Sequence, residues 1–266
     1  MALPKVPLFD AHCSIGRRRA RRPWQFSTVA ELIAEMDHHG IEWALVHHAT
    51  AEEHHPNIGN ELLLQELQGQ PRLVPCWVLL PPATEEMPPR VRGPDGTVEE
   101  GHHRPVAWMM QRGIRAARLC PSAHGWSLIE QTAWELFTAL AQHRIPTFID
   151  KAEIAWEQID AICSAFPELC LILTDTGYRL SRDLLPALAK HRNLFVESSR
   201  YEVHQGLEEL CERFGSRRVL FGTGMPTYAP GCAITMLASA HLSDHDKELI
   251  ANGNLSRLLK GGRAGG

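Results

Sequence analysis

Hydrophobic and polar positions along the chain alternate between two kinds of segment. Short runs of apolar residues are typical of parallel strands that are buried on both faces. Longer segments repeat their apolar residues with helical spacing. The strand-like runs occupy residues 7–13, 43–49, 73–80, 114–120, 145–150, 170–175, 194–198 and 219–222. The helical segments occupy residues 28–39, 57–68, 104–112, 127–143, 153–165, 182–191, 205–214, 231–240 and 244–251.

Eight strand–helix repeats in 266 residues are typical of an α/β fold, the (β/α)8 or TIM barrel. The alternative, a doubly wound open sheet, usually carries a Gly-rich G-x-G-x-x-G motif after its first strand. Here the first strand leads into Gly16 and an arginine-rich stretch, residues 17–22, without that motif. We therefore predict a single TIM-barrel domain over residues 1–266. Residues 81–103 are rich in Pro, Gly and acidic residues, and we interpret them as a long loop or lid after the third strand.

Composition narrows the class of partner. The chain has 27 basic and 31 acidic residues, so nothing in the overall charge indicates nucleic acid or an anionic membrane. No apolar run approaches the roughly 20 residues of a membrane span, and the N-terminal residues lack a signal-peptide pattern. Seven cysteines without a Cys-x-x-Cys pair favour a reducing, cytoplasmic location. We expect a small anionic molecule as the partner and leave assembly into a homo-oligomer open.

Polar residues stand at the carboxyl ends of most predicted strands, which is where TIM barrels carry their chemistry. Ionisable groups at the ends of apolar strands are costly to bury unless they are paired or take part in function. The residues are His12, Ser14, His47, His48, Arg118, Cys120, Asp150, Asp175, Glu197 and Arg200. Together they predict a polar pocket at one end of the barrel.

Several stretches of the chain resemble the amidohydrolase-related TIM barrels, a family that includes decarboxylases of aromatic and muconate-type acids and lactone hydrolases. The resemblance extends from Phe9 to Leu259. It is carried by Asp-Ala-His at 10–12, Gly-Ile-Arg-Ala-Ala-Arg-Leu-Cys-Pro at 113–121, Ile-Pro at 145–146, Phe-Gly-Thr-Gly-Met-Pro at 221–226 and Gly-Asn-Leu-Ser-Arg-Leu-Leu at 253–259. It implies a hydrolase or lyase acting on a small carboxylated or lactone-like substrate.

The metal ligands that the resemblance implies are mostly replaced in this chain. The His-x-His of the first strand is His12 with Ser14, and the family's histidines on the fifth and sixth strands fall at Asp150 and Asp175. The eighth-strand aspartate, a metal ligand and general base in the family, falls at Gly224. We therefore expect no tightly bound metal and no other cofactor. If a divalent ion such as zinc or manganese is bound, His12, Asp150 and Asp175 would hold it.

We assign acid/base roles to His12, Asp150 and Asp175, supported by Glu197. Two buried carboxylates that face each other would raise one pKa and give an acid and a base. The alternative is that an arginine such as Arg118 or Arg200 neutralises each aspartate. The expected substrate-binding residues are Ser14, His47, His48, Arg118, Cys120, Tyr178 and Arg200; among them the guanidinium of Arg118 suits a substrate carboxylate.

The sequence is compatible with two other functions. The loss of the eighth-strand aspartate is compatible with a catalytically inactive barrel that binds a ligand. The altered His/Asp set is compatible with a metal-dependent hydrolase.

Overall fold

The computed structural model describes residues 6–20, 22–82 and 105–262. The predicted lid at 81–103 therefore lies, apart from Pro81 and Pro82, outside the described residues. None of the described helices is both long and apolar enough to cross a membrane.

Parallel strands form a closed barrel. Within the described residues the strands are β1 (Leu8–Ile15), β2 (Ile41–His48), β3 (Leu73–Pro75), β4 (Trp77–Val78), β5 (Ala117–Leu119), β6 (Thr147–Asp150), β7 (Leu171–Thr174), β8 (Leu194–Glu197) and β9 (Val219–Leu220). Each pairs in parallel with the next, in the orders β1-β2-β3 and β4 to β9. The predicted third strand is split at Cys76, so β3 and β4 together act as one of the eight barrel strands.

Two sets of backbone contacts join these sheets into a ring. The Cys76 N–H donates to the Val46 carbonyl at 2.8 Å, which continues the pairing from β2 to the third barrel strand. On the other side, the Ala11 N–H donates to the Phe221 carbonyl at 2.9 Å, and Cys13 pairs in parallel with Met225. The chain that follows β9 thus lies against β1, and the predicted TIM barrel is confirmed.

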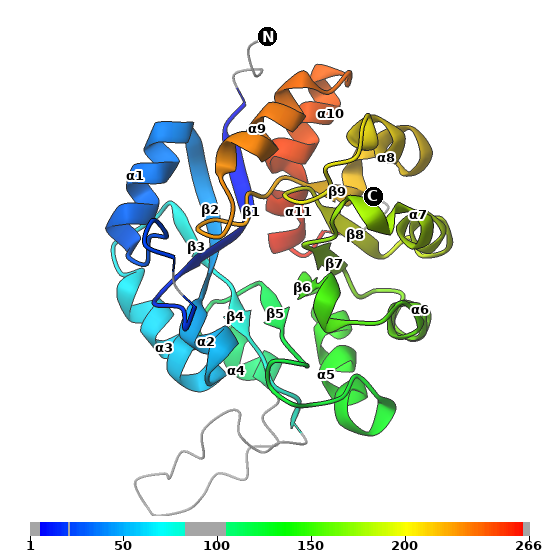
Figure 1. Ribbon diagram of the computed structural model, residues 1–266. Coiled ribbons are helices and arrows are strands. Elements are labelled where there is room, and N and C mark those ends of the chain that lie inside the picture. Colours follow the sequence, from blue (N-terminus) through cyan, green and yellow to red (C-terminus); the bar gives the residue numbers. More distant parts are fainter. Residues whose placement is uncertain (1–5, 21, 83–104, 263–266) are drawn as a thin grey trace, which may run out of the picture.

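Helices surround the strands (Figure 1). They are α1 (Val29–His39), α2 (Ala49–Glu53), α3 (Pro56–Glu66), α4 (Pro105–Gln111), α5 (Glu130–Gln142), α6 (Trp156–Ala165), α7 (Ser181–Lys190), α8 (Gly206–Phe214), α9 (Pro230–Ser239), α10 (Asp244–Glu248) and α11 (Asn254–Leu259). Helix α1 shows how the sequence sets their bounds. It begins with a capping box between Thr28 and Glu31 and ends at Gly40, whose φ of 69° is left-handed. Glycine adopts that conformation without the steric cost of a Cβ.

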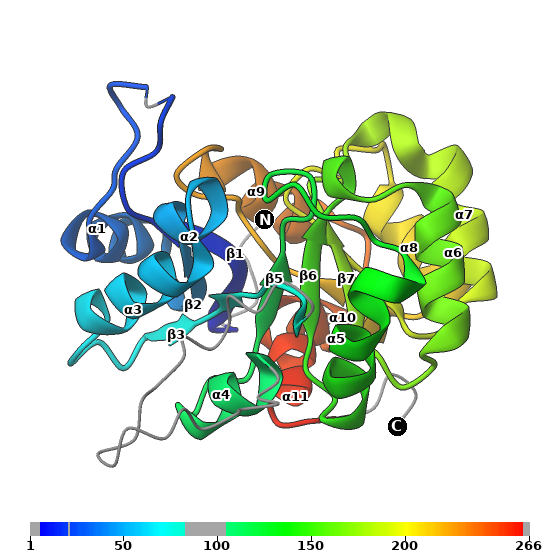
Figure 2. The same cartoon turned by 90° about the horizontal axis from the view of Figure 1, so that it is seen from below.

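The core has an outer layer between strands and helices and an inner layer inside the barrel. The inner layer contains strand residues such as Phe148, Ile172 and Phe195, together with Leu255 and Leu258 of α11. Helix α11 therefore packs into the end of the barrel where the strands begin, and Figure 2 shows it at one end of the strands. The opposite end, where the strands finish, is left for a site.

Two helices are absent from the sequence prediction. Helix α2 directly follows β2 because the side chain of His48 accepts the Thr50 N–H and caps the helix. Helix α11 follows a π-helical turn, Leu249–Gly253, that continues from α10. Both are short, and the apolar period of a helix is hard to recognise over five or six residues.

Candidate active site

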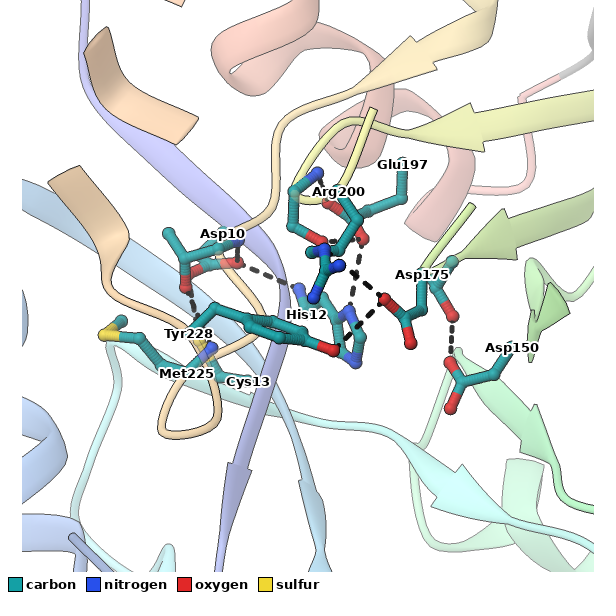
Figure 3. A network of polar contacts seen from close by, with 12 residues as sticks. Asp10, His12, Cys13, Asp150, Asp175, Glu197, Arg200, Met225 and Tyr228 are labelled. Carbon is teal, nitrogen blue, oxygen red and sulfur yellow. Dashed lines mark hydrogen bonds and ion pairs between the residues drawn. The ribbon is translucent and has the colours of Figure 1, made fainter. Parts of the chain in front are cut away.

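His12 and Glu197 meet at the mouth of the barrel, from the first and the penultimate strand segments. The Nδ1–H of His12 donates to Oε2 of Glu197 at 3.1 Å. The side chain of Glu197 is fully buried, whereas 12% of the His12 side chain is exposed. The carboxylate thus fixes the imidazole through one nitrogen and leaves Nε2 for chemistry at the mouth (Figure 3).

Glu197 is itself held in place. Its carboxylate accepts the Ser199 N–H at 2.5 Å and the Ser199 hydroxyl at 2.8 Å. Gly222 makes room for it, because a Cβ at position 222 would lie 2.5 Å from Cδ of Glu197. A buried polar group is costly unless it is hydrogen-bonded, and these donors satisfy the carboxylate oxygens. The local sequence Glu-Ser-Ser after β8 supplies them.

Asp10 fixes the seam between β1 and the segment after β9. The Asp10 side chain is completely buried and accepts the backbone N–H groups of His12 and Thr223, each at 2.9 Å. It also accepts the Thr223 hydroxyl and the Cys13 thiol. Burial raises the pKa of Asp10, and these hydrogen bonds oppose the rise. Asp10 therefore positions the backbone that carries His12.

Arg118 and Asp150 form an ion pair beside the histidine. Nη1 of Arg118 donates to Oδ1 of Asp150 at 2.8 Å, and the side chains are 2% and 25% exposed. The Thr174 hydroxyl donates to the same carboxylate oxygen. Burial alone would raise the pKa of Asp150, but the charges of Arg118 and His12 and these hydrogen bonds hold it below its usual value. Asp150 is therefore an anion at neutral pH rather than a proton donor.

A second polar group comes from β2, α2 and the loop after β1. The Nε2–H of His47 donates to Glu52 at 2.9 Å, and Arg18 donates to Glu52 at 3.1 Å and to the Ser14 hydroxyl at 3.0 Å. Burial, followed by the charge of Arg118, lowers the pKa of His47 to about 4. His47 is thus neutral at pH 7, and its ring stacks on that of His12 with 6.2 Å between the centroids.

Asp175 faces Tyr228 and Arg200 (Figure 3). The Tyr228 hydroxyl donates to Oδ1 of Asp175 at 3.2 Å, while Nε of Arg200 is 3.9 Å from that oxygen. The Arg200 guanidinium lies over the Tyr228 ring, 4.4 Å from its centroid. Asp150 and Asp175 are thus held by different partners, Asp150 by Arg118 and Asp175 by Tyr228.

Gly224 cannot carry the side chain that the family resemblance implies at this position without rearrangement. Its φ is +70°, and a Cβ there would lie 2.6 Å from Cδ2 of Tyr228. The aromatic ring of Tyr228 thus takes the space beside residue 224. Tyr228, like Arg18 and Glu52, is a site residue that sequence reasoning missed, because all three lie in loops or in the unpredicted helix α2.

Three of the expected substrate-binding residues make no hydrogen bond to this group in the described parts of the chain, although Cys120 lies close enough to Arg118 and Asp150 for their charges to act on its thiol. His48 caps α2 and packs over Gly16, where a Cβ would lie 2.5 Å from its ring. Tyr178 is 57% exposed and contacts Arg179. Cys120 is buried against Ala51 and Val78, and burial raises the pKa of its thiol well above the usual value. These contacts fit structural roles for His48 and Cys120 and a surface position for Tyr178.

The donor groups do not fit the metal set that the resemblance implies. Nδ1 of His12 is engaged by Glu197, Oδ1 of Asp150 by Arg118 and Thr174, and Asp175 by Tyr228. Across the described parts of the chain, no three His, Cys, Asp or Glu side chains lie together in a position to hold a metal ion.

Comparison with known proteins shows the family and the fold. The family model described as amidohydrolase matches residues 80–260, and none of the curated proteins matches the chain. An uncharacterized TIM-barrel protein from Bordetella bronchiseptica is 16% identical, with 98% of this chain and 100% of that chain covered and a TM-score of 0.70. A dihydroxybenzoic acid decarboxylase from Polaromonas sp. JS666, with bound manganese and the inhibitor 2-nitroresorcinol, is 14% identical (96% and 97% covered, TM-score 0.69). A probable 2-pyrone-4,6-dicarboxylic acid hydrolase from Acinetobacter baumannii, with citric acid bound, is 15% identical (95% and 99% covered, TM-score 0.63).

Proposed function

Because the chain belongs to the amidohydrolase family, we propose that it is a hydrolase or a decarboxylating lyase for a small carboxylated or lactone-like substrate. The reaction takes place at the carboxyl ends of the strands. Proteins with this fold include an aromatic acid decarboxylase and a probable pyrone dicarboxylic acid hydrolase, and these chemistries define the substrates worth testing first. No tightly bound metal is part of this proposal.

The observation that carries the proposal is the contact between His12 and Glu197. With Nδ1–H donated to a buried carboxylate, Nε2 is the atom that exchanges a proton with substrate or water. In lactone hydrolysis, Nε2 takes a proton from the attacking water and returns it to the ring oxygen as the C–O bond breaks. In decarboxylation, the C–C bond breaks, carbon dioxide leaves, and the protonated imidazole gives its proton to the ring carbon.

Substrate recognition is assigned to the cations around His12. The bond from Arg118 to Asp150 uses Nη1, and within the described residues its Nη2 has no hydrogen-bond partner, so a substrate carboxylate can be bound there. Arg18 lies close enough to Arg118 for their charges to interact. Arg200 lies on the other side, over the Tyr228 ring. An anionic substrate would offset the repulsion between Arg18 and Arg118.

The absence of a required metal is supported by the occupation of the donor groups. Moving Asp150 onto a metal ion would break its bond to Arg118, whose side chain is almost fully buried. An unpaired buried guanidinium is costly, of the order of several kcal/mol. The charge that a metal supplies in other members of the family would here be supplied by guanidinium groups.

The test is a turnover assay on two substrate classes. Release of carbon dioxide from dihydroxybenzoates and loss of 2-pyrone-4,6-dicarboxylate would be followed with wild type, Glu197→Gln and Glu212→Gln. Glu212 is an exposed residue of α8 and serves as the control. We expect turnover of at least one class, reduced about 100-fold or more in Glu197→Gln and unchanged in Glu212→Gln. Equal rates in the two variants would contradict the assigned role of the pair.

A further inference from the structure

A second cavity, lined by arginines and apolar side chains, lies at the opposite end of the barrel. Its volume is about 770 Å³, within the range of roughly 300–1,000 Å³ that is usual for small-molecule sites. It is formed by the last turns of α7 and α8, the turn that precedes β9, and α10. These segments precede strands or end helices, so the cavity is on the face where the strands begin. It shares no residue with the site around His12.

Positive charge dominates the walls of this cavity. Four arginines line it against one acidic residue, Asp246. Both carboxylate oxygens of Asp246 are already bound, by the hydroxyls of Ser216 and Ser243, each at 2.6 Å. The arginines are Arg192, Arg213, Arg217 and Arg218. Arg213 pairs with Glu209 at 2.8 Å, which leaves the charge of the other three uncompensated by an ion pair within the described residues.

Arg218 is fixed in the wall of the cavity by two hydrogen bonds to backbone carbonyls. The residue is 8% exposed, and its two terminal nitrogens donate to the carbonyls of His191 at 2.7 Å and Leu188 at 2.8 Å. Its Nε is buried without a hydrogen-bond partner. Burial and the nearby charge of Arg192 lower the pKa of Arg218. The positive charges of Arg218 and Arg192 repel each other, and an anion bound between them would offset that repulsion.

The dipoles of α7 and α8 explain only some of the arginines in this cavity. The carboxyl ends of α7 and α8 carry partial negative charge, which favours basic residues nearby and explains the anchoring of Arg218. It does not account for Arg192 and Arg217, which are exposed and make no hydrogen bond or ion pair through their side chains in the described structure. Burial lowers the pKa of Arg257, and the nearby charge of Arg217 lowers it further.

We propose that this cavity binds a small multivalent oxyanion, a molecule bearing phosphate or several carboxylates, at a site separate from the catalytic one. Arg192 and Arg217 would close on the ligand from the rim, and Arg218 would supply the fixed charge in the wall. The cavity volume favours a small molecule over the flat surface of an acidic protein.

Binding of inorganic triphosphate, measured by calorimetry on the full chain, tests this site. The variant Arg192→Gln/Arg217→Gln removes two exposed side chains and leaves the wall intact. Arg115→Gln is the matched control, because Arg115 is an exposed arginine just before β5, at the same end of the barrel but outside this cavity. A parallel titration with citrate distinguishes a phosphate-bearing ligand from a polycarboxylate.

We expect saturable binding of at least one probe to wild type with one site per chain. The affinity should fall about tenfold or more in the double variant, because two charge-assisted contacts are lost, and it should stay within about twofold in Arg115→Gln. Partial recovery in Arg192→Lys/Arg217→Lys would support the role of the charges. The proposal is overturned if neither probe binds saturably, or if the double variant binds as tightly as Arg115→Gln. Retained binding there would place the anion among the arginines around His12.

Discussion

The carboxylate of Glu197 lies against Gly222, in the space that a Cβ at position 222 would take. A Cβ there would come 2.5 Å from Cδ of Glu197, closer than carbon atoms approach without displacement. The absence of a side chain at one strand end thus permits a buried carboxylate on its neighbour, β8. That carboxylate in turn orients His12. The contact explains why the barrel needs glycine at a position where φ is not left-handed.

Gly222→Ala should therefore impair both stability and activity. The added methyl group must push Glu197 away from Ser199 and His12, at a cost of about 1–3 kcal/mol in the free energy of unfolding. Gly231→Ala is the matched control, because residue 231 lies in α9 and a Cβ there would meet no atom within 4 Å. Its expected effect is neutral or stabilising by up to about 1 kcal/mol. Chemical denaturation measures both, and equal losses would contradict the contact.

The two aspartates of the mouth should differ strongly in their effect on folding. Asp150→Asn leaves the buried Arg118 without its counter-ion, and we expect a loss of about 2–4 kcal/mol in the free energy of unfolding. Asp175→Asn removes a half-exposed group with a 3.9 Å contact to Arg200, so a loss below about 1 kcal/mol is expected. Urea titrations of the two variants provide the comparison. A larger effect of Asp175→Asn would show that the assignment of their partners is wrong.

Tyr228 should set the cost of a side chain at position 224. Gly224→Ala has to overcome a left-handed φ and the contact with Tyr228, whereas Gly125→Ala has a similar φ of +68° and no neighbour within 4 Å. We expect Gly224→Ala to cost about 1–3 kcal/mol more than Gly125→Ala. In a double-mutant cycle with Tyr228→Ala, the combined loss should be smaller than the sum. An additive result would mean that the ring does not restrict position 224.

His47 should make folding stability depend on pH in a defined window. Its pKa is about 4 in the folded protein and about 6.5 for an unperturbed histidine, so between these pH values the unfolded chain binds a proton that the folded chain does not. Its contribution is fully present above pH 6.5 and is lost as the pH falls towards about 4, by about 3 kcal/mol.

The variant His47→Gln isolates this contribution, because it keeps a polar side chain near Glu52 without a titrating ring. Asp150 and Glu52 also have lowered pKa values in the folded protein, but their effect falls at lower pH, below about 4.5. The difference in unfolding free energy between wild type and His47→Gln should therefore change between pH 6.5 and 4. A constant difference over that range would contradict the neutral state of His47.

The sequence predicts the barrel well because most strands are apolar runs and the longer helices repeat their apolar residues with helical spacing. It also places His12, Arg118, Asp150 and Glu197 at one end, since parallel strands finish on the same face. The sequence leaves open whether Asp150 forms an acid/base pair with Asp175 or is neutralised by an arginine such as Arg118. Which partner Asp150 takes depends on the hydrogen-bond donors that lie nearest to its carboxylate in the folded chain, and the spacing of residues in the sequence does not determine this.

The site residues that the sequence does not predict, Arg18, Glu52 and Tyr228, are positioned by the segments that connect the strands and helices. Arg18 and Glu52 meet because the chain after β1 folds against α2, and no local pattern encodes that contact. Tyr228 reaches Asp175 because the chain takes a left-handed turn at Gly224. Tyr178, in contrast, lies close to Asp175 in the sequence, but its side chain is exposed on the surface. Propensity and periodicity describe elements, whereas the site is completed by the segments between them.

Proton transfer at the mouth of the barrel is assigned to His12 and Glu197, without a metal ion. Its most direct test is the turnover rate of chelator-treated protein whose metal content has been measured, compared with the untreated protein and with a His12→Asn variant. We predict the same rate with and without treatment, and a loss of about 10²- to 10⁴-fold in His12→Asn. Loss of activity on chelation, with recovery on adding one equivalent of a divalent ion, would contradict metal-free proton transfer by His12.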